Sequence, residues 1–109
     1  MNHFESVHTT EIDGFVIELS VTPETDTPDW DFVSEEDRQD TLDRINNGYL
    51  LWFVAKVTAS KLGIVLGTEY LGGCCYERIS EFLNDPYFVD MVDQAIAEAK
   101  NNIQLLVEV

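Results

Sequence analysis

The run Tyr49–Ser60 constrains the fold most, because both of its faces are apolar in its first half. Alternate positions give one face Leu51, Phe53, Ala55, Val57 and Ala59, and the opposite face begins with Leu50, Trp52 and Val54. Successive side chains of a strand point to opposite faces, so this run reads as a strand that is covered on both sides. We therefore place it in the centre of a sheet.

Turn residues indicate the neighbouring strands. Val7–Ile12 and Phe15–Thr22 flank Asp13-Gly14, a favoured two-residue hairpin turn because both of its positions need a positive φ. A tight connection at residues 61–63 leads from the central strand to the run Ile64–Tyr76. Within that run, Gly67 and the pair Gly72-Gly73 predict a bulge or a close approach of another backbone.

Three helical segments complete the pattern. Ser34 is a good N-cap and opens a helix that we expect to end near Ile45. A short helical turn follows at Ser80–Leu83, and Asp85-Pro86 begins the last helix. Residues at helical spacing form a continuous apolar stripe on that helix: Phe88, Met91, Val92, Ala95, Ile96, Ala99, Ile103 and Leu106. We predict one α+β domain over residues 1–109: a four-stranded antiparallel sheet, the long C-terminal helix packed on one face, and a short acidic helix between strands 2 and 3.

The charge of the chain is unusual. Asp and Glu total 21 against 6 Lys and Arg, so the formal net charge is -15. Solubility needs a magnitude of only about 2–8 in a small domain. An acidic surface repels phosphate, which argues against direct binding to nucleic acid or to an anionic membrane and favours a basic protein partner. General acidity without a specific partner remains the alternative.

The acids concentrate between Glu24 and Asp43, where nine of twenty residues are acidic. The candidate partner-binding residues are Glu24, Asp26, Asp29, Trp30, Asp31, Glu35, Glu36, Asp37, Asp40 and Asp43. On a helix, Glu36, Asp40 and Asp43 share one face, where like charges cost a few tenths of a kcal/mol each. Local folding does not account for that repulsion, whereas binding to Lys and Arg does. The alternative is a solvated helix face that tolerates it.

Two features inside this block have competing interpretations. Trp30 is either an apolar anchor for a partner or, with Phe32, a residue that pins the loop to the sheet. Oxygen ligands for calcium are present, but the regular Asp-x-Asp-x-Asp-Gly spacing is missing. We expect neither a metal nor another cofactor.

Catalysis is not expected. Cys74 and Cys75 are adjacent, so on a strand they point to opposite faces and cannot easily hold one ion. No catalytic residue set is identified, and we interpret both cysteines as packing residues. The few cysteines, the polar N-terminus and the short apolar runs indicate a reducing cytoplasm, that of the protein's own cell or of a host.

Three stretches resemble a group of small acidic proteins from bacteriophages and mobile elements: TPDWDFVSEEDRQDTLDRI, YLLWFVAKVTASKLGIVLGTEYLGGCCYE and FVDMVDQAIAEAK. The segment YLGGCCYE is the most specific part, and the similarity extends from about His8 to the C-terminal helix. The group has no established activity, so the resemblance implies an origin. Bacteriophages make small acidic proteins that block host defences, including anti-CRISPR and anti-restriction proteins that mimic DNA.

The predicted function is therefore inhibition of a nucleic-acid-binding defence protein of the host, by a monomer or homodimer. An immunity protein that neutralises a basic toxin nuclease is one alternative. Another is a phage accessory domain that binds a small ligand, or associates with itself, through the sheet face that the C-terminal helix leaves open. In that case Leu50, Trp52 and Val54 are the residues that matter.

Overall fold

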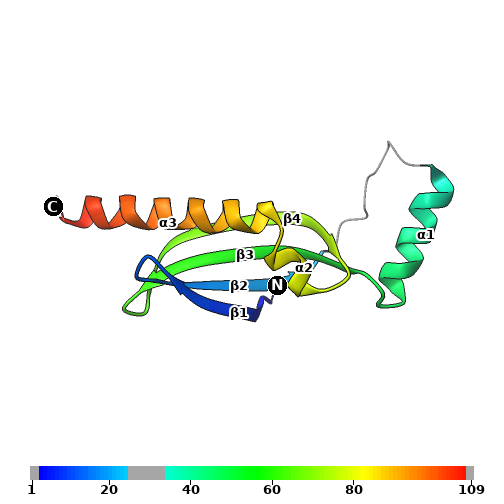
Figure 1. Cartoon of the computed structure of the whole chain (residues 1–109), viewed down its shortest axis with the longest axis horizontal. Helices are drawn as coiled ribbons and strands as arrows, with labels where there is room; N and C mark the ends of the chain where they lie inside the picture. Colours follow the sequence, from blue (N-terminus) through cyan, green and yellow to red (C-terminus); the bar gives the residue numbers. More distant parts are fainter. Residues whose placement is uncertain (1–2, 25–33, 108–109) are drawn as a thin grey trace.

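The computed structural model describes residues 3–24 and 34–107. Its elements are β1 (Glu5–Ile12), β2 (Phe15–Pro23), α1 (Glu35–Asn46), β3 (Leu51–Lys61), β4 (Ile64–Tyr76), α2 (Ile79–Leu83) and α3 (Pro86–Val107). The strands form one antiparallel sheet in the order β1-β2-β3-β4, and α3 lies along one face of it (Figure 1). The predicted α+β architecture is confirmed.

Both hairpins turn where the sequence indicates. Asp13 and Gly14 have φ angles of 55° and 81°, and the turn between β3 and β4 has φ angles of 54° at Leu62 and 78° at Gly63. β1 begins earlier than expected, because Glu5 still pairs with Val21 of β2. Two-residue turns with positive φ match the twist of the flanking strands and so fix the register of the sheet.

β3 begins two residues later than expected. The N–H groups of Tyr49 and Leu50 donate to the carbonyl of Arg44, at 2.8 and 3.2 Å, instead of joining the sheet. These bonds, with Gly48 at a φ of 81°, close the end of α1. The residues before Leu51 therefore serve as the cap of a helix, as Schellman-like endings do.

The core lies between the sheet and α3. Ile17 and Leu19 of β2 and Val57 of β3 are fully buried on the face toward the helix. At one end of the core, Phe82 of α2 packs edge-on against Phe53, with ring centroids 5.6 Å apart. These residues bury the apolar stripe of α3, which is the main source of stability in such a fold.

The glycines of β4 are explained by close approach and by bulges. A Cβ atom at Gly67 would overlap the carbonyl oxygen of Ala95, so this glycine lets α3 lie directly on the strand. The register of β3 and β4 shifts on passing from Ala59 to Ser60, opposite Gly67, and again near Gly72-Gly73. Both features that the sequence indicated at these glycines are present.

The other sheet face is more polar. Ser20, Thr22 and Thr58 are buried there, while Trp52 and Val54 are half-buried. The rings of Phe4 and Tyr70 lie 6.0 Å apart, and the ammonium of Lys56 lies 5.3 Å from the centroid of the Phe4 ring. Aromatic rings and a lysine therefore cover part of this face, which does not form a continuous apolar surface.

The predicted stripe on α3 is only partly buried. Its members from Phe88 to Ala99 are buried, but Ile103 is half-buried and Leu106 is 69% exposed. Leu106 lies on the predicted stripe but is exposed, because α3 continues past the part of the sheet that it covers (Figure 1). Helical periodicity identifies the face of a helix and says nothing about where its support ends.

Candidate protein-binding surface

The acidic helix α1 is built by local signals. Ser34 is its N-cap, and its side-chain oxygen accepts a hydrogen bond from the backbone N–H of Asp37 at 3.1 Å. Glu35, Glu36 and Asp37 occupy the first turn, where negative charge is favourable beside the positive end of the helix dipole. Capping and dipole together explain why a helix with so little apolar surface forms at this position.

α1 contributes nothing to the core. None of its twelve residues is buried, and it stands away from the sheet at the right of Figure 1. Leu42 and Ile45, its apolar residues, are only half-buried. A weak ion pair, 3.7 Å from Arg44 to Glu77, joins its C-terminal end to the residues that follow β4. The helix α1 is therefore exposed to solvent and is not packed against the sheet.

Charge pairing divides the acids of α1 into two groups. Glu35 forms an ion pair with Arg38 at 3.1 Å, and both groups are partly or largely exposed. Asp43 accepts a hydrogen bond from the side-chain amide of Gln39 at 3.0 Å, which brings no opposing charge. Among the described residues, neither Glu36 nor Asp40 has an ion-pair or hydrogen-bond partner. Glu36, Asp40 and Asp43 thus place three carboxylates on one face of α1, and no ion pair within residues 3–24 and 34–107 neutralises them.

The structure brings together one half of the predicted site. Glu35, Glu36, Asp37, Asp40 and Asp43 all lie exposed on α1. Three predicted acids and one aromatic residue lie outside the described residues: Asp26, Asp29, Asp31 and Trp30.

Glu24 belongs to the sheet rather than to the face of α1. It follows β2, and its carboxylate accepts a hydrogen bond from the backbone N–H of Gly73 at 3.1 Å. Its own N–H donates to the carbonyl of Trp52 at 3.0 Å. Glu24 therefore caps the bulge of β4, which gives it a structural role that a count of acidic residues does not reveal.

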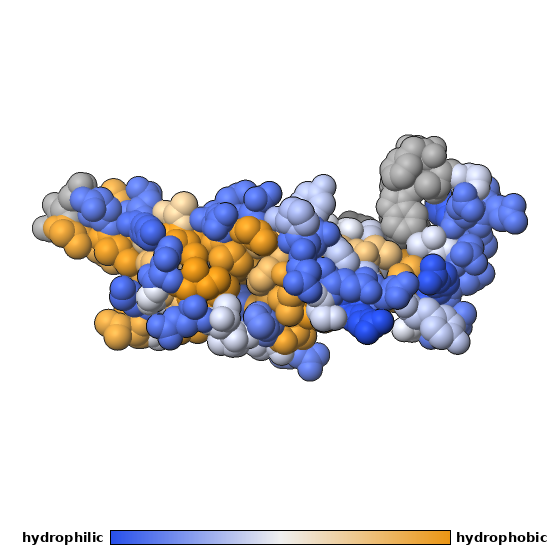
Figure 2. Space-filling model, viewed as in Figure 1, coloured by the Kyte–Doolittle hydropathy of each residue, from blue (hydrophilic) through white to orange (hydrophobic). Residues whose placement is uncertain are grey.

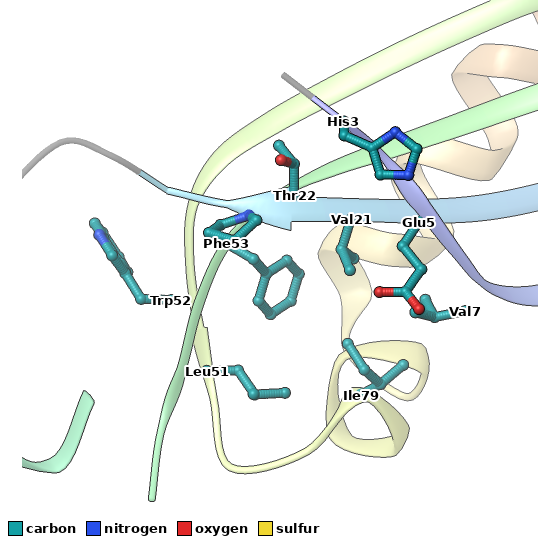
Figure 3. Close-up of a pocket in the computed structure, with 10 residues that line it drawn as sticks. His3, Glu5, Val7, Val21, Thr22, Leu51, Trp52, Phe53 and Ile79 are labelled. Carbon is teal, nitrogen blue, oxygen red and sulfur yellow. The ribbon is translucent and has the colours of Figure 1, made fainter. Parts of the chain in front are cut away.

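Sequence reasoning missed a cavity at the end of the sheet nearest α1. Its volume is about 710 Å³. It is lined by His3, Glu5, Val7, Val21, Thr22, Pro23, Leu51, Trp52, Phe53 and Ile79. Figure 3 shows the carboxylate of Glu5 close to Val7 and Ile79, and Trp52 on the far side. No sequence motif indicates this cavity, because its lining residues come from three strands and α2. Taken one at a time, these residues are typical of strands and of a core.

The cysteine pair is poorly suited to nucleophilic chemistry. Cys74 is buried, and its thiol donates to the carbonyl of Leu71 at 3.4 Å. Burial raises the pKa of the Cys74 thiol to about 11, and burial also raises the pKa of Cys75. His8 packs its ring on Phe88 and belongs to β1, the opposite edge strand from β4. At neutral pH both thiols stay protonated, and His8 is not placed to act as their base.

Within residues 3–24 and 34–107, no group of three or more His, Cys, Asp or Glu side chains is arranged to hold a metal ion. No helix there has the length and apolar character needed to cross a membrane. Comparisons with protein-family models, curated proteins and solved structures returned no match for the chain.

Proposed function

We propose that this protein binds a positively charged protein surface through α1, and that its target is a nucleic-acid-binding defence protein of a bacterial host. One observation carries the proposal: five acidic residues sit on a helix with no buried residue, standing clear of the core. Such a helix gains little from tertiary packing, so its repelling charges are best explained by a partner that neutralises them.

The spacing of the charges supports a target that normally holds nucleic acid. A helix rises 1.5 Å per residue, so the carboxylates of Glu36, Asp40 and Asp43 are distributed over roughly 10 Å. That is about one charge per 5 Å, compared with one phosphate per 3.4 Å of axis on a DNA strand. Lys and Arg side chains are long and flexible enough to accommodate this difference.

An immunity protein that neutralises a basic nuclease uses the same surface chemistry and remains the alternative within this class. In both cases the protein occupies the groove that nucleic acid occupies. In both cases raised salt weakens binding, chiefly by slowing association, because exposed charges steer the encounter. The two differ in the target, a host defence protein or a toxin nuclease.

The experiment is affinity capture from a bacterial lysate on the immobilised protein, with elution first by salt and then, in a parallel sample, by duplex DNA. We expect one nucleic-acid-binding protein to elute in both. Release by DNA shows that the two ligands compete for one groove. A captured protein that resists both salt and DNA would contradict the proposal, as would one that binds DNA and this protein simultaneously.

The cavity supports a second candidate function, binding of a small apolar ligand. Its volume of about 710 Å³ falls within the range of about 300–1,000 Å³ typical of ligand pockets. Its walls are mostly aliphatic and aromatic, with Glu5, Thr22 and His3 as polar groups. We expect the neutral dye Nile red to bind there, and Trp52→Ala to weaken binding while Leu106→Ser does not. Equal loss in both variants, or no binding at all, would contradict it.

A further inference from the structure

Two segments without a charged residue meet at the end of the molecule opposite α1. They are Leu62–Thr68, at the turn and start of β4, and Asn101–Val107, at the end of α3. The side-chain amide of Asn102 donates to the carbonyl of Leu66 at 2.6 Å and holds the segments together. Charged residues make up 25% of the chain, so two adjoining stretches of seven uncharged residues are a local departure from its composition.

Both segments expose large apolar side chains. Leu106 is 69% exposed although it continues the stripe that α3 buries against the sheet. Ile64 pairs with Lys61 and so shares the face of β3 that meets α3, yet it is 60% exposed, and Leu62 at the turn is 93% exposed. Figure 2 shows apolar surface along the C-terminal part of α3 and at the tip of the hairpin below it. We call this region, residues 62–65 and 103–107, the apolar end.

We infer that the apolar end is an interface with a second copy of this chain. Depletion of charged residues distinguishes the centre of a protein interface from ordinary surface, and homodimer interfaces are the most apolar class. Here the depletion coincides with exposed aliphatic side chains that have no cover among the described residues. Exposed apolar patches of this kind are uncommon on monomers.

The charge distribution favours a second copy over the basic partner proposed for α1. The acids proposed to attract a basic protein lie on α1. The molecule measures 57 Å along its longest axis, and salt screening limits the reach of an exposed charge to about 8 Å, so these acids do not attract a basic partner to the apolar end. Lys100 lies 3.5 Å from Asp13 beside the apolar end, and Lys61 stacks on Phe15. These lysines balance the local charge, so two copies meet there without the repulsion expected of a chain with a net charge of -15.

An end-to-end dimer has a consequence for function. Two-fold pairing is the commonest symmetry of soluble oligomers, and it brings the same patch of each copy together. The two α1 helices then lie at opposite extremes of the dimer, as far apart as the chain allows. The inference does not depend on what α1 binds, because removing charge from α1 leaves the apolar end unchanged.

The test is sedimentation velocity of the full chain from micromolar to near-millimolar concentration at physiological salt. We expect a concentration-dependent dimer. Leu106→Lys and Leu62→Lys should each raise its dissociation constant by at least about tenfold, because each places an unpaired charge in an apolar contact. Val89→Lys is the matched control, since Val89 is an exposed apolar residue near the other end of α3.

Three outcomes overturn the inference. One is a monomer at every concentration. Another is a dimer that Leu106→Lys and Val89→Lys weaken equally, which places the contact elsewhere. The third is a monomer that co-sediments with phosphatidylcholine vesicles through the same residues, which makes the apolar end a lipid-binding surface. Circular dichroism of each variant confirms that the substituted protein is folded.

Discussion

The helices α1 and α3 show two ways in which one chain uses a helix. α3 has 22 residues and buries six of them against the sheet, whereas α1 has 12 residues and buries none. α3 is held by its apolar stripe, and α1 by its N-cap and the bonds that close its end. The described helix with the most acidic face is thus the one on whose packing the fold depends least.

The contrast extends to the two ends of the molecule. At the α1 end, Glu36, Asp40 and Asp43 have no ion-pair partner among the described residues, whereas residues 62–65 and 103–107 of the apolar end include no charged residue. Neither arrangement improves the core that lies between them. Both are therefore better explained by contacts with other molecules than by stability.

The largest effect on stability should come from the contact between α3 and β4. In Gly67→Ala the new methyl overlaps the carbonyl of Ala95 and approaches the backbone nitrogen of Ala99 at 3.2 Å, so α3 must move away from the strand. We expect a loss of about 3 kcal/mol in the free energy of unfolding, measured with urea.

Gly72→Ala is the control for that substitution. A Cβ at Gly72 meets only the carboxylate of Glu24, at 3.2 Å, and the φ angle there is not positive. We expect a loss below about 1 kcal/mol. Equal losses in the two variants would show that Gly67 is not the point where α3 seats on the sheet.

A smaller effect should appear at alkaline pH. Burial raises the pKa of Cys74 from 9.0 to about 11, so the folded state holds this proton more tightly than the unfolded state. The resulting stability is fully present below pH 9 and is lost as the pH rises through 11. Between pH 8 and pH 10.5 the wild type should lose about 2 kcal/mol more than Cys74→Ala.

Urea unfolding at the two pH values measures this difference directly. The pKa of Tyr76 is also raised, chiefly by burial and by a hydrogen bond with Asp85, and Cys74 is only a minor cause of that shift, so the contribution of Tyr76 largely cancels from the comparison. The same pH dependence in wild type and variant would contradict the assignment of the effect to Cys74.

The smallest effect should come from α1. The triple variant Glu36→Gln, Asp40→Asn, Asp43→Asn removes like-charge repulsion but also a favourable charge at the helix N-terminus, each worth a few tenths of a kcal/mol. We expect the free energy of unfolding to change by less than about 1 kcal/mol. A loss as large as that in Gly67→Ala would mean that α1 is part of the core after all.

Much of the fold could be predicted from local signals. Asp13-Gly14 placed the first hairpin, Gly67 marked a close approach, and Ser34 placed the start of α1. Each of these depends on a backbone conformation or a cap that a few adjacent residues determine. The acidic face of α1 was likewise predictable, because spacing along a helix alone decides which residues share a face.

The features that the sequence did not predict depend on contacts between distant segments. Periodicity placed Leu106 on the apolar stripe of α3, but it does not reveal that the sheet leaves the end of α3 uncovered. Glu24 was grouped with the acids of α1, yet it bonds to Gly73 across the sheet. The cavity at Trp52 and Ile79 is formed by elements whose approach no local pattern specifies.

The central claim is that partner binding depends on the acidic face of α1 and not on the overall charge of the chain. The most direct measurement compares the triple variant of α1 with a charge-matched variant of α3, Asp90→Asn, Asp93→Asn, Glu98→Gln, all three exposed on that helix. Calorimetric titration with the captured partner gives the affinity of each. We predict that the α1 variant binds at least about tenfold more weakly than wild type, while the α3 variant changes by less than about twofold. Equal loss in both variants would contradict the claim and leave only general acidity.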